Sequence, residues 1–330
     1  MPAQDFRSYY LHVGEQERQR LAHLRQKRPI HSKTEYLALQ AQEQTSTEDP
    51  RKTMERIDRA LDYLRANYKS GEGLRLARLQ KRFMRETRTA ILQIVFGKQL
   101  KYYLPWIRER YGIKEVYRLI AVIFPRRAGK TVAQCIAAAV LQVALYDGNF
   151  VVFNLTGRQA RAWLKQYLGY LETFQDSAEF GYTIESCDIR EAIMIKARAT
   201  GTKNTVSSFP GSQGSGFNNL RGMGVHIKGV FIDEAFFFET RAMEVILPLL
   251  RTGAFLIMTS SLPSGDARHG VMAILDAELN GTLLVRQVNF IRACDECRIA
   301  HREDQCNHTI QRPEFFHVPP KSFLYFPSQL

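Results

Sequence analysis

The chain has 330 residues, of which 45% are apolar and 24% charged, and this ordinary globular composition excludes a wholly disordered, collagen-like or coiled-coil protein. Lys and Arg outnumber Asp and Glu by 46 to 33, and the formal net charge of +13 favours a polyanionic partner, either nucleic acid or an acidic membrane surface. No apolar run could span a bilayer, no secretory signal begins the chain, and five cysteines argue against a disulfide framework, so we expect an intracellular protein.

The positive charge is concentrated in the N-terminal third. Residues 1–115 hold 24 basic and 14 acidic residues, whereas residues 116–330 hold 22 and 19. Residues 1–48 are polar and Gln-rich, so we expect a basic, partly disordered arm that binds nucleic acid, acts as a localisation signal or is a mobile tail. Helical spacing of apolar residues predicts a helical N-terminal region over residues 49–115.

From Leu119 onward, short apolar runs alternate with helical segments. Apolar strands that alternate with helices indicate a mostly parallel α/β sheet flanked by helices, which we assign to one domain over residues 116–330. A stretch rich in Gly, Ser and Asn, residues 207–224, predicts a long mobile loop. The predicted strands are 119–124, 150–156, 191–197, 230–232, 255–259 and 283–290, and the predicted helices are 131–145 and 160–174.

Residues 124–131, with the sequence FPRRAGKT, follow a predicted strand and begin a predicted helix. They match the second half of the phosphate-binding loop G-x-x-x-x-G-K-[ST], although Phe124 replaces its first glycine. In such a loop Gly129 allows close backbone approach, Lys130 contacts the β- and γ-phosphates, and Thr131 ligates Mg²⁺. The alternative is an ordinary strand-to-helix turn. The candidate ATP-binding residues are Pro125, Arg126, Arg127, Ala128, Gly129, Lys130 and Thr131.

A second predicted strand ends in the adjacent carboxylates Asp233 and Glu234. In P-loop NTPases such a strand lies beside the P-loop strand, its Asp holds Mg²⁺ through water, and a following Glu polarises the attacking water. The alternative is an acidic pair at a helix N-terminus. Because the acidic pair follows a P-loop in the same chain, we expect Asp233 to bind the nucleotide's Mg²⁺ and Glu234 to be catalytic.

A third predicted strand, residues 255–259, runs into the hydroxyl side chains of Ser260 and Ser261. In helicase-like ATPases, a strand next to the acidic-pair strand ends in small polar residues of this kind. We therefore expect the Ser260 hydroxyl to sense the γ-phosphate or the attacking water. The alternative is a strand followed by a Ser-rich turn.

Four segments, taken in order, resemble the ATPase of a viral genome-packaging terminase large subunit. They are PRRAGKT, FNLTGRQARAWL, NNLRGMGVHIKGVFIDEA and LIMTSSLPSG, and they place the resemblance over about residues 115–310. The chain is most similar to the herpesvirus type, whose P-loop also runs Pro-Arg-Arg-x-Gly-Lys-Thr without the first glycine. The resemblance rests on the order and spacing of the motifs, because each motif alone is weak.

This resemblance implies a P-loop NTPase of the additional-strand (ASCE, RecA-like) class that pushes double-stranded DNA into a procapsid. It implies ATP and Mg²⁺ as cofactors, a homo-oligomeric ring, and the host cell nucleus as the location, with no membrane partner. Its implied partners are double-stranded DNA, a portal protein and other terminase subunits. Terminases also carry a C-terminal nuclease, but about 70 residues follow Ser260, so we expect no nuclease domain in this chain.

The same resemblance implies two further sites. Terminases often use an arginine in the P-loop, so Arg126 or Arg127 is a catalytic candidate that would contact the γ-phosphate. Adenine is bound by residues just upstream of the P-loop strand, which makes Gln99, Tyr102 and Tyr103 candidates; core packing is the alternative for the two tyrosines.

The C-terminal segment 294–308 carries five soft metal ligands within fifteen residues. Tetrahedral Zn²⁺ needs four such ligands, and a C-x₂-C pair is a common half-site. We predict a zinc site in this segment, and the alternative is a surface loop with reduced thiols. The predicted ligands are Cys294, Cys297, Cys306 and His308, with His301 as the alternative histidine.

Two other functions are compatible with these motifs. A helicase-like P-loop ATPase would need a second RecA-like domain, for which residues 262–330 are too few. A non-catalytic DNA-binding or assembly subunit with a relic P-loop would explain the missing first glycine, but it would not explain the intact Lys130, Thr131, Asp233 and Glu234.

Overall fold

The computed structural model describes residues 48–124, 128–211, 227–238, 253–261, 285–289 and 299–300. The chain divides into residues 1–49 and 50–330, and the helices and strands given below belong to the second unit. The predicted arm, residues 1–48, lies outside the described residues except for its last position.

Helices form over the N-terminal region at the positions that the apolar spacing predicts. They bury one apolar face each, with Met54 and Leu64 on the first helix and Phe83 and Ile91 on the second. These faces pack against the body of the sheet domain, since the first helix contacts α6 and the second contacts α6, β1 and β7. The elements are α3 (Pro50–Gly71), α4 (Arg78–Phe96), η1 (Gly97–Gln99) and α5 (Leu100–Tyr111).

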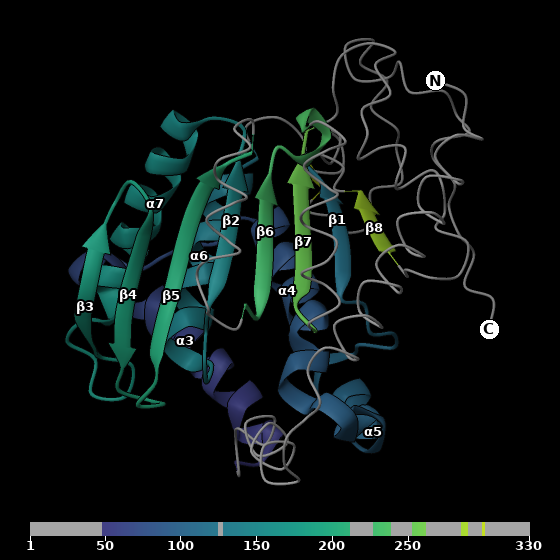
Figure 1. The fold of residues 1–330 in the computed structure, drawn as a ribbon. Helices are drawn as coiled ribbons and strands as arrows, with labels where there is room; N and C mark the ends of the chain where they lie inside the picture. Colours follow the sequence, from purple (N-terminus) through teal and green to yellow (C-terminus); the bar gives the residue numbers. More distant parts are fainter. Residues whose placement is uncertain are drawn as a thin grey trace, which may run out of the picture. The chain divides into compact units, whose positions relative to one another are not determined.

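An eight-stranded sheet forms the centre of the domain, in the order β3-β4-β5-β2-β6-β7-β1-β8 (Figure 1). The six strands from β5 to β8 are parallel to their neighbours, and only β4 runs antiparallel to the strands on its two sides. The predicted mostly parallel α/β sheet is therefore confirmed. The strands are β1 (Leu119–Ile123), β2 (Phe150–Asn154), β3 (Tyr182–Asp188), β4 (Ala192–Ala197), β5 (Lys203–Pro210), β6 (Gly229–Asp233), β7 (Phe255–Ser260) and β8 (Val285–Asn289).

The strand order corrects one prediction about the site. The acidic-pair strand β6 does not lie beside the P-loop strand β1, because β7 pairs with both and separates them. All six residues of β7 are buried, which suits a strand covered on both faces. Its register aligns Ser260 with Ile123 and Thr259 with Asp233, so the ends of the three strands lie level. This order, with one strand inserted between β1 and β6, is that of the additional-strand class.

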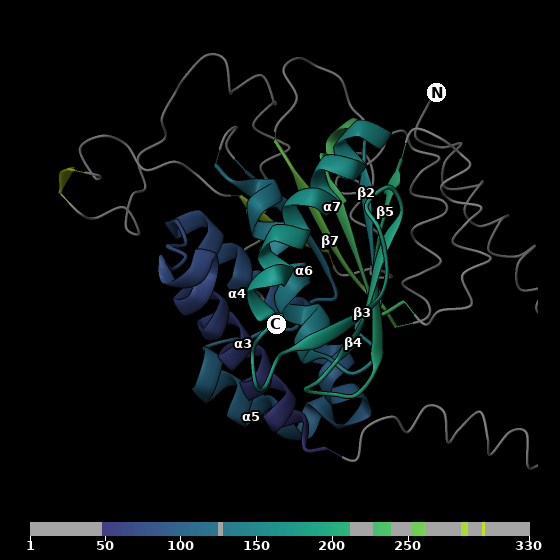
Figure 2. The same ribbon diagram turned by 90° about the vertical axis from the view of Figure 1, so that its left-hand side faces the viewer.

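Two helices follow the first two strands, α6 (Lys130–Ala144) after β1 and α7 (Gly157–Leu171) after β2, and η2 (Glu172–Phe174) extends α7. Figure 2 shows α3, α4, α6 and α7 on one side of the sheet. Helix α6 is buried from Ala133 to Ala144, as its Ala-, Val- and Leu-rich sequence predicts. No helix among the described residues is long and apolar enough to cross a membrane.

Two strands were missed by the sequence analysis. Strand β3 lies at an edge of the sheet and has six exposed residues, so it lacks an apolar pattern; Cys187, predicted in a loop, belongs to it. Strand β5 includes Ser207, Ser208, Phe209 and Pro210, which corrects the start of the predicted mobile loop; the rest of that loop, except Gly211, lies outside the described residues.

Candidate functional site

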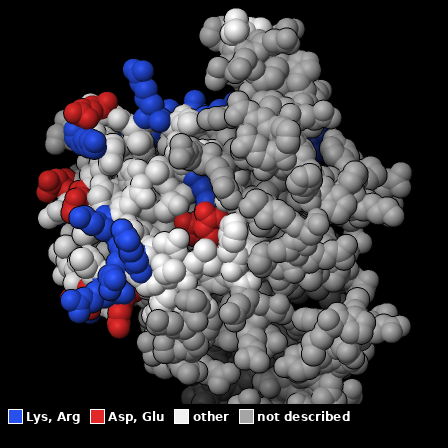
Figure 3. Space-filling view, turned by 90° about the horizontal axis from the view of Figure 1, so that it is seen from above, with Lys and Arg blue, Asp and Glu red and all other residues white. Residues whose placement is uncertain are grey.

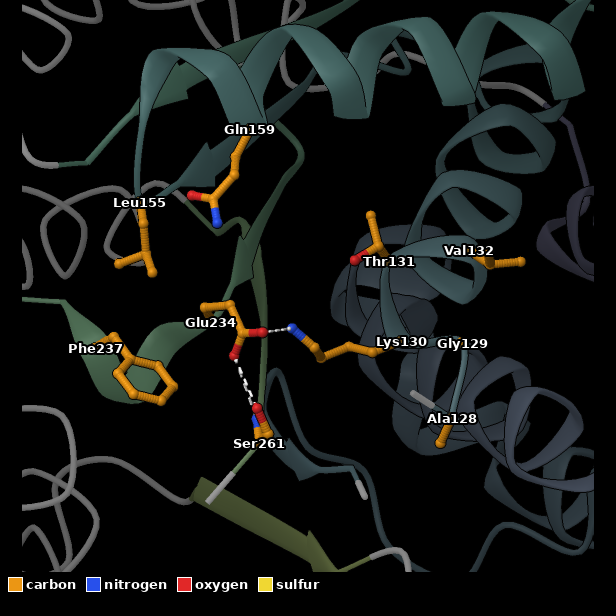
Figure 4. A pocket seen from close by; sticks show the side chains of 10 residues that line it. All are labelled: Ala128, Gly129, Lys130, Thr131, Val132, Leu155, Gln159, Glu234, Phe237 and Ser261. Atoms are coloured by element: carbon orange, nitrogen blue, oxygen red, sulfur yellow. Dashed lines mark hydrogen bonds and ion pairs between the residues drawn. The ribbon is translucent and has the colours of Figure 1, made fainter. Parts of the chain in front are cut away.

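A pocket of about 510 Å³ opens at the carboxyl ends of the central strands, where parallel α/β sheets commonly bind ligands. Figure 4 shows its walls, which come from the start of α6 and from the residues that follow β2, β6 and β7. In Figure 3, which looks down on this edge, acidic side chains lie beside a basic one. The lining residues are Ala128, Gly129, Lys130, Thr131, Val132, Leu155, Gln159, Glu234, Phe237 and Ser261.

The loop before α6 requires glycine at position 129. Gly129 has φ of 78°, in the left-handed region that side chains disfavour. A Cβ there would also lie 2.6 Å from Nε2 of Gln80, at the start of α4. Ala128, Lys130 and Thr131 lie on the pocket wall as predicted, whereas residues 125–127 of the predicted loop lie outside the described residues.

Phe124 has a structural role that explains the missing first glycine. Its backbone N–H donates to the carbonyl of Ser260 at 2.8 Å, so the extended backbone of β1 continues through this position. The Phe124 side chain is 1% exposed and its ring packs against Phe83 of α4, with 5.8 Å between centroids. Phe124 is therefore a core residue at the end of β1, and its presence does not disturb Lys130 or Thr131.

Lys130 brings the P-loop and the acidic pair together. Its Nζ lies 2.6 Å from Oδ1 of Asp233 and 2.7 Å from Oε1 of Glu234. The side chains of Lys130 and Asp233 are only 11% and 9% exposed, so water screens their attraction weakly. One cation faces two carboxylates, which leaves the cluster with an excess negative charge suited to a further cation.

Asp233 and Glu234 both reach Lys130 because the backbone changes direction between them. Successive side chains on a strand point to opposite faces. Glu234, however, follows the last residue of β6 and has φ of 58°, a left-handed conformation that is rare outside glycine. Strained backbone of this kind is characteristic of functional sites. The conformation places both carboxylates on the pocket side of the strand end.

Ser261, rather than Ser260, holds the Glu234 side chain. The backbone N–H and Oγ of Ser261 donate to Oε2 of Glu234 at 3.4 and 3.2 Å, and Ser261 lines the pocket (Figure 4). Ser260 is 1% exposed and its Oγ accepts the N–H of Phe236 at 3.2 Å. The predicted sensor is thus shifted by one residue, because side chains alternate along β7 and Ser260 faces the core.

The pocket provides the oxygen ligands that Mg²⁺ prefers. The Thr131 hydroxyl donates to Oδ2 of Asp233 at 2.8 Å, so an alcohol and a carboxylate lie together beside the P-loop lysine. Thr259 of β7 also donates to Oδ1 of Asp233, at 3.3 Å. These residues fit the predicted magnesium site. Among the described residues, no group of three or more His, Cys, Asp and Glu side chains forms a metal cluster.

A buried amide connects α6 to the two strands that carry the site. Gln134 is 0% exposed and its Nε2 donates to the Ile232 carbonyl at 3.1 Å and to Oγ1 of Thr259 at 2.8 Å. Its Oε1 accepts the indole N–H of Trp163 at 3.4 Å. Since unpaired buried amides are costly, these bonds fix the P-loop helix against β6, β7 and α7. Sequence analysis missed Gln134, which its apolar neighbours conceal.

The structure does not bring the adenine candidates to the pocket. Gln99, Tyr102 and Tyr103 belong to η1 and α5, at the end of the sheet opposite the strand arrowheads (Figure 1). The Tyr103 ring packs against Phe96 with 5.0 Å between centroids, and Tyr102 is 71% exposed. For Tyr103, the alternative of aromatic packing is correct.

Several other predicted residues lie outside the described part of the chain. These are Pro125, Arg126, Arg127 and the zinc ligands Cys294, Cys297, Cys306 and His308, so the arginine and zinc assignments stay predictions. Cys135, by contrast, is fully buried in α6, and burial raises the pKa of its thiol well above its usual value. It is a core residue, as expected.

No protein-family model matches the chain, and no curated protein matches it significantly. Among solved structures, it is similar to the large terminase ATPase domain of Thermus phage P74-26, with 13% identity, 60% of this chain and 86% of that chain covered, and a TM-score of 0.44. It is also similar to the large terminase of another thermophilic bacteriophage in complex with ADP, with 20% identity, 59% and 45% covered, and a TM-score of 0.41. The Phi-28 gp11 DNA packaging motor is a third, at 13% identity, 64% and 70% covered, and a TM-score of 0.32.

Proposed function

We propose that this chain is the ATP-hydrolysing motor subunit of a terminase that packages double-stranded viral DNA into procapsids. One observation supports the ATPase assignment most directly. Lys130, Asp233 and Glu234, from segments about 100 residues apart, converge at the carboxyl ends of parallel strands, with Thr131 beside them. Neither an ordinary strand-to-helix turn nor an acidic pair at a helix N-terminus requires this convergence.

The roles of the residues follow from their positions. Lys130 leaves the two carboxylates to contact the β- and γ-phosphates as a compact point charge. Glu234, freed from Lys130 and still bonded to Ser261, accepts a proton from the attacking water. Asp233 and Thr131 would hold Mg²⁺, which when bound neutralises charge on the phosphate oxygens. Arg126 or Arg127 would add charge at the γ-phosphate.

The terminase assignment rests on the order and spacing of the four sequence motifs. By the same resemblance we propose double-stranded DNA, a portal protein and other terminase subunits as partners, in a homo-oligomeric ring. The Pro-Arg-Arg-x-Gly-Lys-Thr pattern supports the proposal of a herpesvirus-type subunit that acts in the host cell nucleus.

Phosphate release by the purified chain, with and without nucleic acid, tests the proposal. We expect ATP hydrolysis that double-stranded DNA stimulates without regard to sequence. Stimulation by single strands alone would favour the helicase-like ATPase instead. A folded chain that neither binds nor hydrolyses ATP would favour the non-catalytic subunit with a relic P-loop.

A basic hollow between α4 and α5 supports the nucleic-acid part of the proposal. It has a volume of about 500 Å³ and its cationic lining residues are Lys81, Arg85, Arg88 and Arg110. Arg88 is paired with Asp58 of α3 at 2.8 Å, and the Tyr111 hydroxyl donates to the same carboxylate at 3.0 Å. The other three cations are exposed, so the hollow has an excess of positive charge.

The spacing of these cations is unfavourable for the helix alone. Lys81 and Arg85 lie one turn apart on α4, where like charges destabilise a helix by about 0.2–0.5 kcal/mol. Burial and the neighbouring Asp58 raise the pKa of Tyr111, which therefore remains a neutral hydrogen-bond donor. Cations and a phenol around one hollow fit phosphate groups, and we propose that this surface contacts the DNA backbone.

Salt dependence of DNA binding tests this surface. Substitution of Lys81, Arg85 and Arg110 by Gln should make the slope of log affinity against log salt less negative by about one for each phosphate that the variant no longer neutralises. The matched control replaces three exposed cations of α7, Arg158, Arg161 and Lys165, by Gln. An unchanged slope in the hollow variant would place the contacts elsewhere, and deletion of residues 1–48 then tests the basic arm.

A further inference from the structure

Gln159 lines the pocket from the first turn of α7 (Figure 4). It is the third residue of the helix and forms a capping box with Thr156, the residue before the helix. Its backbone N–H donates to Oγ1 of Thr156 at 3.2 Å, and its side-chain Oε1 accepts the Thr156 N–H at 3.1 Å. A capping box explains a glutamine here, but a glutamate would serve equally well.

The capping bonds fix which end of the amide faces the pocket. A backbone N–H can only donate, so the atom that it contacts must be the carbonyl oxygen of Gln159. The Thr156 hydroxyl donates to the same oxygen at 3.2 Å. The amide nitrogen, Nε2, therefore points away from the helix cap. In Figure 4 it lies on the side that faces Glu234, and within the described residues no protein acceptor bonds to it.

Gln159 and Glu234 lie on the wall opposite the phosphate-binding residues. Lys130 and Thr131 come from the start of α6, across the pocket in Figure 4. A γ-phosphate held by Lys130 would present its far side, where a water attacks in line, toward Glu234 and Gln159. Leu155 and Phe237 complete this wall and contribute apolar surface beside it.

We propose that the amide nitrogen of Gln159 donates a hydrogen bond to the attacking water and so acts as a second catalytic residue beside Glu234. This inference rests on the proposed ATPase function. The water donates one proton to Glu234, accepts the Gln159 N–H with one lone pair, and directs its other lone pair at the γ-phosphorus. The new bond joins the water oxygen to phosphorus, the bond to the β–γ bridging oxygen breaks with its electron pair leaving on ADP, and the proton passes to Glu234.

Two substitutions separate this role from helix capping. Gln159→Glu keeps the acceptor for the Thr156 N–H and has no N–H donor. Gln159→Leu removes both the cap and the donor without adding charge. The control Gln175→Glu adds the same charge at an exposed position after η2, outside the pocket. Turnover, ATP affinity and melting temperature are measured for all three variants and the unmodified chain.

Both Gln159 variants should lower turnover by about 10²-fold, the lower range for the loss of one positioned donor, with ATP affinity unchanged. Only Gln159→Leu should melt at a lower temperature, because only it loses the cap. ADP with aluminium fluoride, which mimics the transferring phosphoryl group and its water, should bind both variants more weakly than the unmodified chain.

The outcomes distinguish the inference from the function on which it rests. If Gln159→Glu turns over ATP at the unmodified rate, Gln159 is a helix cap alone and the inference is wrong. If only Gln159→Glu loses turnover and Gln159→Leu keeps it, the added charge is responsible and the inference is equally wrong. If the unmodified chain binds no ATP, the proposed function itself fails.

Discussion

Lys130→Ala should abolish ATP hydrolysis, measured as phosphate release by the purified chain. Lys130 is the charged group of the P-loop that the structure places on the pocket wall, and it faces both carboxylates of the acidic pair. Without it, the β- and γ-phosphates lose their point charge and must approach Asp233 and Glu234 against like charge. We therefore expect weaker ATP binding as well as loss of turnover.

The same substitution should reduce stability, because it leaves the buried Asp233 carboxylate without its cation. The loss of a partner for a buried acceptor costs about 1–3 kcal/mol in the free energy of unfolding. Lys130→Arg keeps a cation at this position and should retain more of the stability, yet its planar guanidinium cannot replace the compact ammonium at the phosphates. Lys165→Ala, at an exposed position on α7, is the control. Full turnover in Lys130→Ala would remove the P-loop assignment.

The central strands could be predicted because their sequences are apolar on both faces. Strand β5 could not, since Asn204, Thr205, Ser207 and Ser208 have the composition of a loop although all four are buried. Tertiary hydrogen bonds satisfy several of these polar groups. The Asn204 amide donates to the Leu145 carbonyl at 3.0 Å, and Oγ of Ser208 accepts from Asn154 at 3.0 Å. Local composition carries no record of such distant partners.

The residue types of the site could be predicted from motifs, but their arrangement could not. The chain order of β6 and β7 does not reveal that β7 lies between β6 and β1. Alternation along β7 decides between Ser260 and Ser261, and a shift of one residue exchanges the core for the pocket. Gln159 lies within a quoted motif, yet only the structure shows that its amide nitrogen faces Glu234 (Figure 4).

Glu234→Gln should separate ATP binding from hydrolysis. Gln has the size of Glu and can still accept from the N–H and Oγ of Ser261, so the left-handed backbone at this position should persist. It cannot take a proton from the attacking water at neutral pH. We expect turnover to fall by at least ~10²-fold, the lower range for loss of a general base, while ATP binding is retained.

Nucleotide binding should even become tighter in Glu234→Gln, because Lys130 loses one of the two carboxylates with which the phosphates compete for it. Equilibrium binding of ATP, measured beside phosphate release, checks this second effect. Glu191→Gln removes the same charge at an exposed position between β3 and β4 and should change neither quantity. Tighter binding with lost turnover would assign Glu234 to the chemical step. Turnover equal to that of the control would instead make the acidic pair a structural partner of Lys130, because proton transfer to position 234 would then be unnecessary.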